Sequence, residues 1–272
     1  MKKILLFFVL VTILLNFFSI VTEAEEKDLF KFLPPNATLV SPEGVKPYLL
    51  YDFNQDGQEE MIINFKLKAN VQPNPSQYGV IVLRKDHDGW EKIWETQTQG
   101  VGLDYSGVTD ITGDGISEYL FGVTIGASAG NILEIFKWDQ HSLKKIAEVP
   151  YHRLELLKNE KVSLAVWQRY IADTYFVDVL TWNGEKLVLD EERYASYYPQ
   201  IEKFFYDKLA KMDAWFYWYT LADAQIKANQ FEKAKESIQK GTALAKKLSL
   251  SDVVENFGEL KDKLRKKEKA FL

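Results

Sequence analysis

Two short acidic segments carry the side chains best suited to bind a metal ion. They share one spacing: Asp52, Asn54, Asp56, Gly57 and Glu60 in the first, and Asp110, Thr112, Asp114, Gly115 and Glu118 in the second. Alternate residues of a tight turn point to one side, so the oxygens at the first, third and fifth positions converge, and the glycine permits the sharp bend. The next carbonyls, those of Gln58 and Ile116, would join them.

Calcium is the ion that this set of oxygens predicts. Ca²⁺ accepts several hard oxygen ligands in a loose arrangement, whereas Mg²⁺ requires a rigid octahedron and zinc prefers imidazole or thiolate. The alternative is that an Asp-Gly pair supplies turn chemistry alone. Asp88-Gly89 is such a pair, because it lies between two strand-like segments and predicts only a hairpin turn. The two acidic segments add oxygen-bearing positions that a turn does not need.

The segments do not follow the EF-hand pattern, which places a glutamate at the twelfth loop position between two helices. The twelfth residues here are Ile63 and Phe121, and the acid arrives at the ninth position, directly before a strand-like run. This pattern resembles the FG-GAP and VCBS repeats of integrin-type β-propellers. The resemblance implies calcium-binding β-repeats that act in adhesion or in recognition of a protein or glycan. Thr112 replaces the usual Asn or Asp but keeps an oxygen there.

The strand-like segments recur in the same order along the chain. One unit runs from Tyr48 to about Thr96 and a second from Leu103 to about Val149. A third, from 154 to 189, lacks the acidic pattern, so we expect no metal there. Closed propellers need about four to eight blades. We therefore predict an α+β fold whose β-repeat domain, residues 25–198, is a partial propeller of about three blades.

The remaining residues, 199–272, show a hydrophobic period close to four and predict a helical module. Asp213 is expected to cap one of its helices. Part of the module resembles a tetratricopeptide repeat (TPR), with Trp218, Leu221, Ala222, Ala234 and Ile238 around a turn at 228–230. Such a module either offers a groove for a peptide or protein, or only covers the sheet.

The N-terminus has the three regions of a secretory signal peptide. Lys2-Lys3 precede an apolar run from Ile4 to Val21, and Thr22-Glu23-Ala24 supply a cleavage site after Ala24. We expect a secreted or cell-surface protein with residues 1–24 removed. The run is nearly long enough to cross a bilayer, so anchoring in the membrane through an uncleaved segment is the alternative. The absence of cysteine excludes disulfides and thiol catalysis and fits a bacterial surface.

The sequence offers only a weak case for catalysis. Gly126-Ala127-Ser128-Ala129-Gly130 matches the nucleophile elbow of hydrolases, and Asp139 with His141 or His152 follow in hydrolase order. An elbow requires a strand-to-helix turn, whereas strand-like segments flank this one on both sides. The net charge of −5 argues against a nucleic-acid partner. We predict a non-enzymatic adhesion, scaffold or binding module; the alternative is an envelope-associated hydrolase or an accessory subunit of one.

Overall fold

The computed structural model describes residues 29–68 and 76–271 of the 272-residue chain. The chain divides into two compact units, residues 1–33 and 34–272. The described part of the first unit contains the short 3-10 helix η1 (Phe30–Phe32). The predicted signal peptide, residues 1–24, lies outside the described residues. None of the helices described is long and apolar enough to cross a membrane.

The second unit begins with a five-stranded antiparallel sheet, called the first sheet. Its strands are β1 (Ala37–Leu39), β2 (Tyr48–Tyr51), β3 (Glu60–Leu67), β4 (Ser76–Asp86) and β5 (Gly89–Gly100). The order is β1-β3-β4-β5, and β2 also pairs with β3. β1 and β2 therefore share one edge of β3: β1 pairs with residues 65–67 and β2 with residues 60–63.

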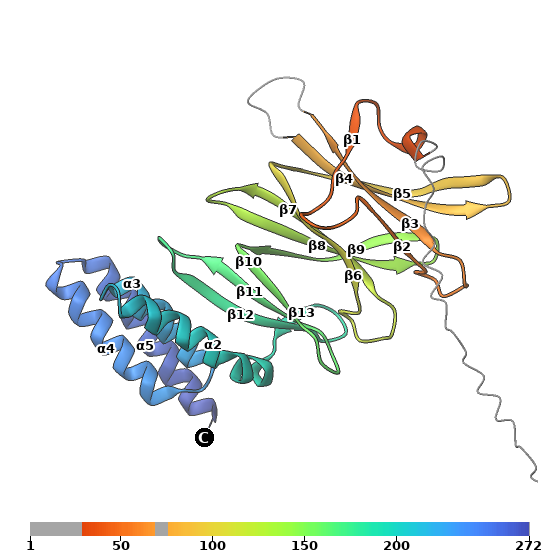
Figure 1. The fold of residues 1–272 in the computed structure, drawn as a ribbon. Coiled ribbons are helices and arrows are strands. Elements are labelled where there is room, and N and C mark those ends of the chain that lie inside the picture. The colour runs from red at the N-terminus through yellow and green to blue at the C-terminus, as the bar shows by residue number, and fades with distance from the viewer. Residues whose placement is uncertain (1–28, 69–75, 272) are drawn as a thin grey trace, which may run out of the picture. The chain divides into compact units, whose positions relative to one another are not determined.

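Two four-stranded antiparallel sheets follow, and each strand in them pairs with the next along the chain. The second sheet contains β6 (Gly102–Thr109), β7 (Glu118–Gly126), β8 (Gly130–Asp139) and β9 (Ser142–Tyr151). The third contains β10 (Arg153–Leu157), β11 (Ser163–Arg169), β12 (Tyr175–Trp182) and β13 (Leu187–Leu189). The predicted α+β class is confirmed, with an antiparallel β-region of three sheets followed by helices (Figure 1).

Hydrophobic side chains join each sheet to the next. Tyr119 and Phe121 of β7 share a buried cluster with Ile62 of the first sheet. Leu120, between them, packs instead with Leu164 of the third sheet. Successive side chains of a strand point to opposite faces, so β7 contributes to two hydrophobic cores at once. This explains why β7 reads as an almost continuous apolar run, as a strand covered on both faces does.

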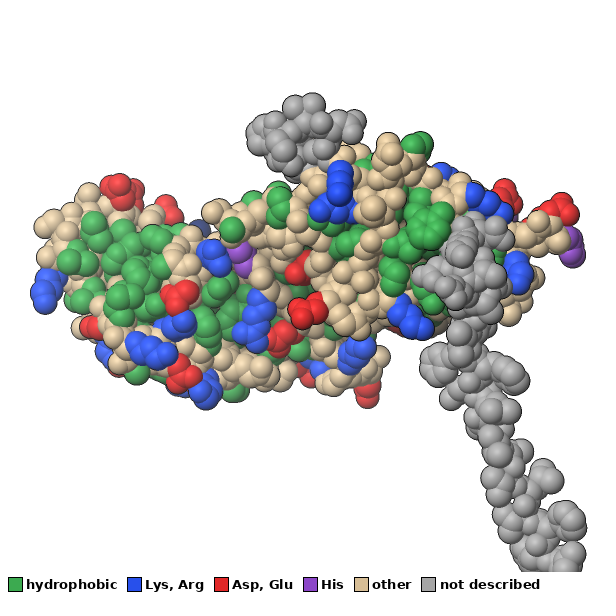
Figure 2. All heavy atoms as spheres, turned by 45° about the horizontal axis from the view of Figure 1, so that its top comes forward, with side chains coloured by type: hydrophobic (Ala, Val, Ile, Leu, Met, Phe, Trp, Pro, Cys, Tyr) green, Lys and Arg blue, Asp and Glu red, His purple; other side chains and the backbone are tan. Residues whose placement is uncertain are grey.

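Four helices complete the unit and cover the third sheet. They are α2 (Glu191–Leu209), α3 (Trp215–Lys227), α4 (Phe231–Lys247) and α5 (Ser251–Phe271). Trp167 and Val177 of the sheet belong to the same buried cluster as Ile201 of α2, Leu221 of α3 and Phe257 of α5. Figure 2 shows hydrophobic side chains gathered over this helical region, at the left of the view, with lysines and acidic residues around them.

The helical region begins at Glu191, earlier than the predicted start at 199. Asp190 caps α2, because its carboxylate accepts a hydrogen bond from the Arg193 amide at 3.0 Å. The next two residues are glutamates, which suit the positive end of a helix dipole. Pro199 lies inside α2. It removes one backbone hydrogen bond, but the buried face that continues on both sides of it (Tyr194, Tyr197, Tyr198, Ile201) keeps the chain helical.

The cap expected at Asp213 is wrong. The residue that precedes α3 is Ala214, which makes no side-chain capping bond. The Asp213 carboxylate instead accepts a hydrogen bond from the indole nitrogen of Trp218 at 2.6 Å. Trp218 is almost fully buried, and its N–H needs a partner that water does not supply there.

A buried ion network fixes the helices to the third sheet. Lys227 of α3 lies 2.6 Å from the Asp178 carboxylate on β12 and 2.8 Å from that of Asp223. Lys263 of α5 reaches the same Asp223 at 2.6 Å. The buried pair is Asp223 with Lys227, and removing either of the two would leave the other in the interior with only a more exposed partner, so the network links β12, α3 and α5.

Candidate metal centre

The two acidic segments connect equivalent strands in neighbouring sheets. The first loop, residues 52–59, joins β2 to β3, and the second loop, residues 110–117, joins β6 to β7. The strand register at the two loops is also the same, because Tyr51 pairs with Glu60 and Thr109 pairs with Glu118. The two acidic segments therefore occupy equivalent places in the first and second sheets.

The two loops also share one backbone conformation. The fourth and sixth positions have positive φ in both: 58° at Gln55 and 87° at Gly57, and 76° at Gly113 and 89° at Gly115. Glycine adopts this region at no steric cost, whereas another residue loses about 1 kcal/mol or more. Gln55 carries that cost in the first loop, where the second loop has a glycine.

In the first loop, side-chain oxygens bind the backbone of the turn. Asp52 accepts hydrogen bonds from the amides of Gly57, at 2.9 Å, and Asp56, at 3.2 Å. Asn54 accepts one from the Asp56 amide at 2.9 Å, and Asp56 accepts one from the Gln58 amide at 2.8 Å. Each carboxylate has about four lone-pair sites, so these bonds orient the oxygens and leave sites for a cation.

The second loop repeats two of these four bonds, those to the amides of the sixth and seventh residues. Asp110 accepts hydrogen bonds from the amides of Gly113, at 2.6 Å, and Gly115, at 2.9 Å. Asp114 accepts one from the Ile116 amide at 3.1 Å, the counterpart of the bond between Asp56 and its own loop. The first and fifth positions are therefore placed alike in both loops.

The ninth-position glutamates, Glu60 and Glu118, close the loops from inside the sheets. Both are buried, and each accepts a hydrogen bond from the amide of the second loop residue: Phe53 at 3.0 Å and Ile111 at 2.8 Å. Phe53 and Ile111 are themselves fully buried, in two different hydrophobic cores. The sequence analysis did not single out these anchors, although an apolar residue at the second position of two polar segments is the signal for them.

A basic residue on the next strand faces each of these glutamates. Arg84 of β4 binds Glu60, with 3.1 Å between its Nε and the nearer carboxylate oxygen. Lys137 of β8 has its Nζ 3.7 Å from the Glu118 carboxylate. Burial raises the pKa of Glu118 above its usual range, and the nearby ammonium opposes that shift. Sequence reasoning missed both cations, because they lie more than fifteen residues from the loops that they serve.

Lys137 also reaches into the second loop. Its Nζ lies 2.5 Å from Asp114 and donates a hydrogen bond to the Thr112 hydroxyl at 3.1 Å. The Lys137 ammonium lowers the pKa of Asp114. Desolvation opposes the charge on Lys137, but its contacts with Asp114 and Glu118 outweigh that effect and raise the pKa of the amine. Three of the predicted ligands of the second loop thus already surround a positive charge.

The first and second loops touch. The Gln55 side chain donates a hydrogen bond to the Gly115 carbonyl at 3.3 Å, and the Ser117 amide donates one to the Tyr51 hydroxyl at 3.1 Å. These two bonds join the region of the first loop to the second loop across the boundary between the first and second sheets.

The donor set decides how well each loop suits calcium. Within residues 29–68 and 76–271, no three acidic or histidine side chains gather as a ready ligand group. The first loop supplies hard oxygens from Asp52, Asn54 and Asp56 at its surface, and Arg84 binds only Glu60 among the loop's acids described here. This set fits Ca²⁺. The second loop fits it only if the ion displaces the ammonium of Lys137.

The residues of the hydrolase alternative do not form a triad, because Asp139 and His141 lie far from Ser128 and His152. Ser128 lies in the turn between β7 and β8, with strands on both sides. His152 contacts the backbone carbonyl of Ser128 at 3.2 Å, and its other ring nitrogen accepts a hydrogen bond from the Arg169 amide. Asp139 ends the ten-residue β8, about 30 Å along the strand from the turn. His141 lies in the turn after β8 and is equally distant.

No protein-family model matches the sequence, and no curated protein matches it.

Proposed function

We propose that this is an exported, non-enzymatic binding protein whose β-repeats are stabilised by calcium. The equivalence of the two loops carries the proposal. They share strand register, the positions of positive φ and the backbone bonds of their first and fifth residues. The side-chain oxygens at these positions hold the backbone of the turn and keep further lone pairs for a cation in both loops.

The resemblance to FG-GAP and VCBS repeats supports a propeller-like arrangement for the three sheets. Two of them are four-stranded meanders of the kind that forms a propeller blade. In the same way, α3 and α4 form a TPR-like pair, supported by the burial of Leu221, Ala222 and Ala234. The partner of such a module would be a surface protein or a glycan.

Calcium would act on stability. In the first loop, Asp52 and Asp56 repel each other until a cation arrives, so the energy of binding becomes energy of folding if the unfolded chain holds the ion poorly. In the second loop the Lys137 ammonium already offsets this repulsion. We expect the first loop to bind more tightly, with affinities in the range of about 10⁻⁴ to 10⁻³ M that extracellular calcium modules use.

Export would follow from residues 1–24 acting as a cleaved signal peptide, and membrane attachment would require that this segment stays uncleaved. N-terminal sequencing of the exported protein distinguishes the two. Cleavage after Ala24 leaves Glu25 as the first residue. A sequence that begins at Met1 or Lys2 would show that the segment is retained.

Thermal denaturation with and without Ca²⁺ tests the function of the loops. Millimolar Ca²⁺ is expected to raise the Tm of the wild type, and Asp56→Ala is expected to remove most of that increase while leaving the Tm in chelator almost unchanged. Asp88→Ala is the matched control, since Asp88 lies in the turn between β4 and β5 and should leave the calcium response intact. A wild-type Tm that ignores calcium would contradict the proposal.

A further inference from the structure

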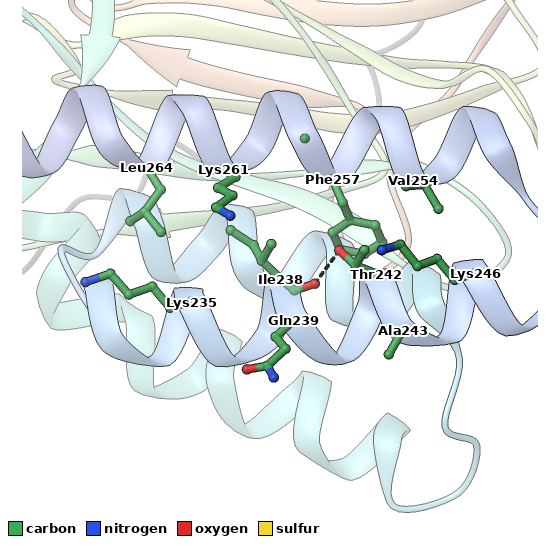
Figure 3. Close-up of a pocket in the computed structure, with 11 residues that line it drawn as sticks. Lys235, Ile238, Gln239, Thr242, Ala243, Lys246, Val254, Phe257, Lys261 and Leu264 are labelled. Carbon is green, nitrogen blue, oxygen red and sulfur yellow. Dashed lines mark hydrogen bonds between the residues drawn. The ribbon is translucent and has the colours of Figure 1, made fainter.

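A groove of about 620 Å³ lies between α4 and α5, on the helical region (Figure 3). Its floor consists of Ile238 from α4 with Phe257 and Leu264 from α5, all of which are buried in the hydrophobic core beneath. The groove is therefore a furrow with an apolar base, bounded by two helices that lie side by side.

Two glycines give the groove its depth and width. At Gly241 of α4, a Cβ atom would stand 2.1 Å from the ring of Phe257, so only glycine lets that ring pack down against the helix. At Gly258 of α5, a Cβ would meet no atom within 4 Å, which leaves the space above the floor open. Gly241 therefore allows Phe257 to pack close to α4, and Gly258 leaves the opening of the groove free of side-chain atoms.

Lysines, and no acidic residues, line this groove. Lys246 of α4 and Lys261 of α5 extend along it from opposite helices (Figure 3). A third, Lys235, lies 2.7 Å from both Glu232 and Glu268 and is already neutralised. No carboxylate of the described chain lies within ion-pair distance of Lys246 or Lys261. Two positive charges thus stand over an apolar floor without a partner for either.

We propose that this groove binds an acidic amphipathic helix of a partner protein. The helix would place its apolar face on Ala243 and Val254, which stay accessible beside the buried floor, and its carboxylates beside Lys246 and Lys261. From Lys235 to Lys246 the groove follows three turns of α4, about 16 Å, which suits a short helix laid between two others. The inference rests on the binding role proposed above and not on the calcium loops.

Fluorescence polarisation with defined peptides tests the proposal on the whole exported protein. The probe is a labelled helical peptide of about 17 residues, with leucine on one face and glutamate beside it; the control peptide carries lysine in place of every glutamate. The acidic peptide is expected to bind and to weaken as salt is raised, whereas the lysine peptide is expected not to bind. Equal binding of the two peptides, or binding of neither, would overturn the proposal.

Variants of the protein locate the binding. Gly258→Leu places a side chain in the opening, where its Cβ meets no atom within 4 Å, and is expected to weaken binding of the acidic peptide at least about tenfold, or about 1.4 kcal/mol. Asn256→Leu adds the same side chain on α5 without changing the charge and outside the groove lining, and is expected to leave affinity unchanged. Full affinity in Gly258→Leu would show that the peptide binds elsewhere.

A change of preference separates recognition from misfolding. The double variant Lys246→Glu with Lys261→Glu is expected to lose the acidic peptide and gain the lysine peptide, which an unfolded protein would not do. A double variant that still prefers the acidic peptide would contradict the assignment. Vesicles of phosphatidylcholine with phosphatidylglycerol test whether the lysines bind an anionic membrane surface instead of a peptide. Vesicle binding that Gly258→Leu leaves intact, with no binding of the acidic peptide, would assign the charge to a membrane surface instead.

Both series are repeated in calcium and in chelator. If the acidic peptide binds but the Tm does not respond to calcium, the groove proposal stands and the proposal of calcium-binding loops is wrong. If the Tm responds to calcium but the acidic peptide does not bind, the calcium-binding loops stand and the groove proposal is wrong.

Discussion

The ammonium of Lys137 lies 2.5 Å from the carboxylate of Asp114, inside a loop whose acidic pattern is typical of a metal site. The equivalent residue of the first sheet, Arg84, binds the buried Glu60 and packs against the ring of Trp138. The two loops have the same backbone conformation but differ in how their negative charge is balanced. That difference makes them distinguishable by experiment.

Replacing Lys137 should convert the second loop into a stronger calcium site. Lys137→Met removes the ammonium and keeps much of the side-chain volume, so Ca²⁺ no longer competes with it, and we expect the affinity of the weaker site to rise by about tenfold, or about 1.4 kcal/mol. Stability in chelator should fall, because Asp114 and Glu118 lose their partner. Calorimetric titration with Ca²⁺ measures the affinity.

Lys144→Met is the control for Lys137→Met, since Lys144 is an exposed lysine on β9 that pairs with Lys137 in the strand register. It removes the same charge without touching the loop. Equal gains in calcium affinity in the two variants would show that net charge, and not the contact with Asp114, sets the difference between the loops.

The two helical glycines of the groove should respond to alanine with opposite signs. Gly258→Ala adds a better helix former in open space and is expected to stabilise the protein by up to about 1 kcal/mol. Gly241→Ala has the same intrinsic gain but drives a Cβ into Phe257, and is expected to destabilise by about 1 to 3 kcal/mol. Urea denaturation of both variants measures the difference. Equal effects would contradict the close packing of Phe257 on α4.

The buried network around Asp223 should be sensitive to the loss of its central charge. Asp223→Asn leaves Lys227 buried with only Asp178 as a charged partner, and we expect a loss of about 3 kcal/mol in the free energy of unfolding. Asp262→Asn, on the exposed side of α5, is the control and is expected to change stability far less. Similar effects of the two substitutions would mean that the network contributes nothing beyond a surface pair.

The same network predicts how acid affects stability. Burial raises the pKa of Asp223, but the charges of Lys227 and Lys263 lower it by more. The pKa of Asp223 in the folded protein is therefore below its usual value. The stabilisation from this group is therefore complete above the unfolded pKa, about 3.9, and is lost as pH falls through the folded pKa. Unfolding free energies measured downward from pH 5 should fall more steeply for the wild type than for Asp223→Asn. Parallel curves would contradict the assignment.

The sequence identified the parts of this fold that depend on local patterns. Alternating strands, the turns between them and the two acidic loops all follow from residues close together in the chain. Predictions from the sequence were wrong where contacts with distant residues decide the structure. Pro199 is typical of a helix boundary, but the buried face of α2 continues through it. Asp213 binds the indole of Trp218 rather than a helix end.

The candidate site divides in the same way. Asp52, Asp56, Asp110 and Asp114 follow from spacing alone, and the structure gives them matching roles in the two loops. The contribution of Lys137 depends on the pairing of β8 with β7, which no local pattern specifies. The groove likewise depends on the fit between Gly241 and a ring sixteen residues further along, at Phe257.

Titration of the protein with Ca²⁺ in a calorimeter shows whether the two acidic loops bind the ion. We expect two binding events, of which the tighter is lost in Asp52→Ala and the weaker is strengthened in Lys137→Met. A wild-type protein that produces no heat of binding at millimolar Ca²⁺ would contradict this expectation.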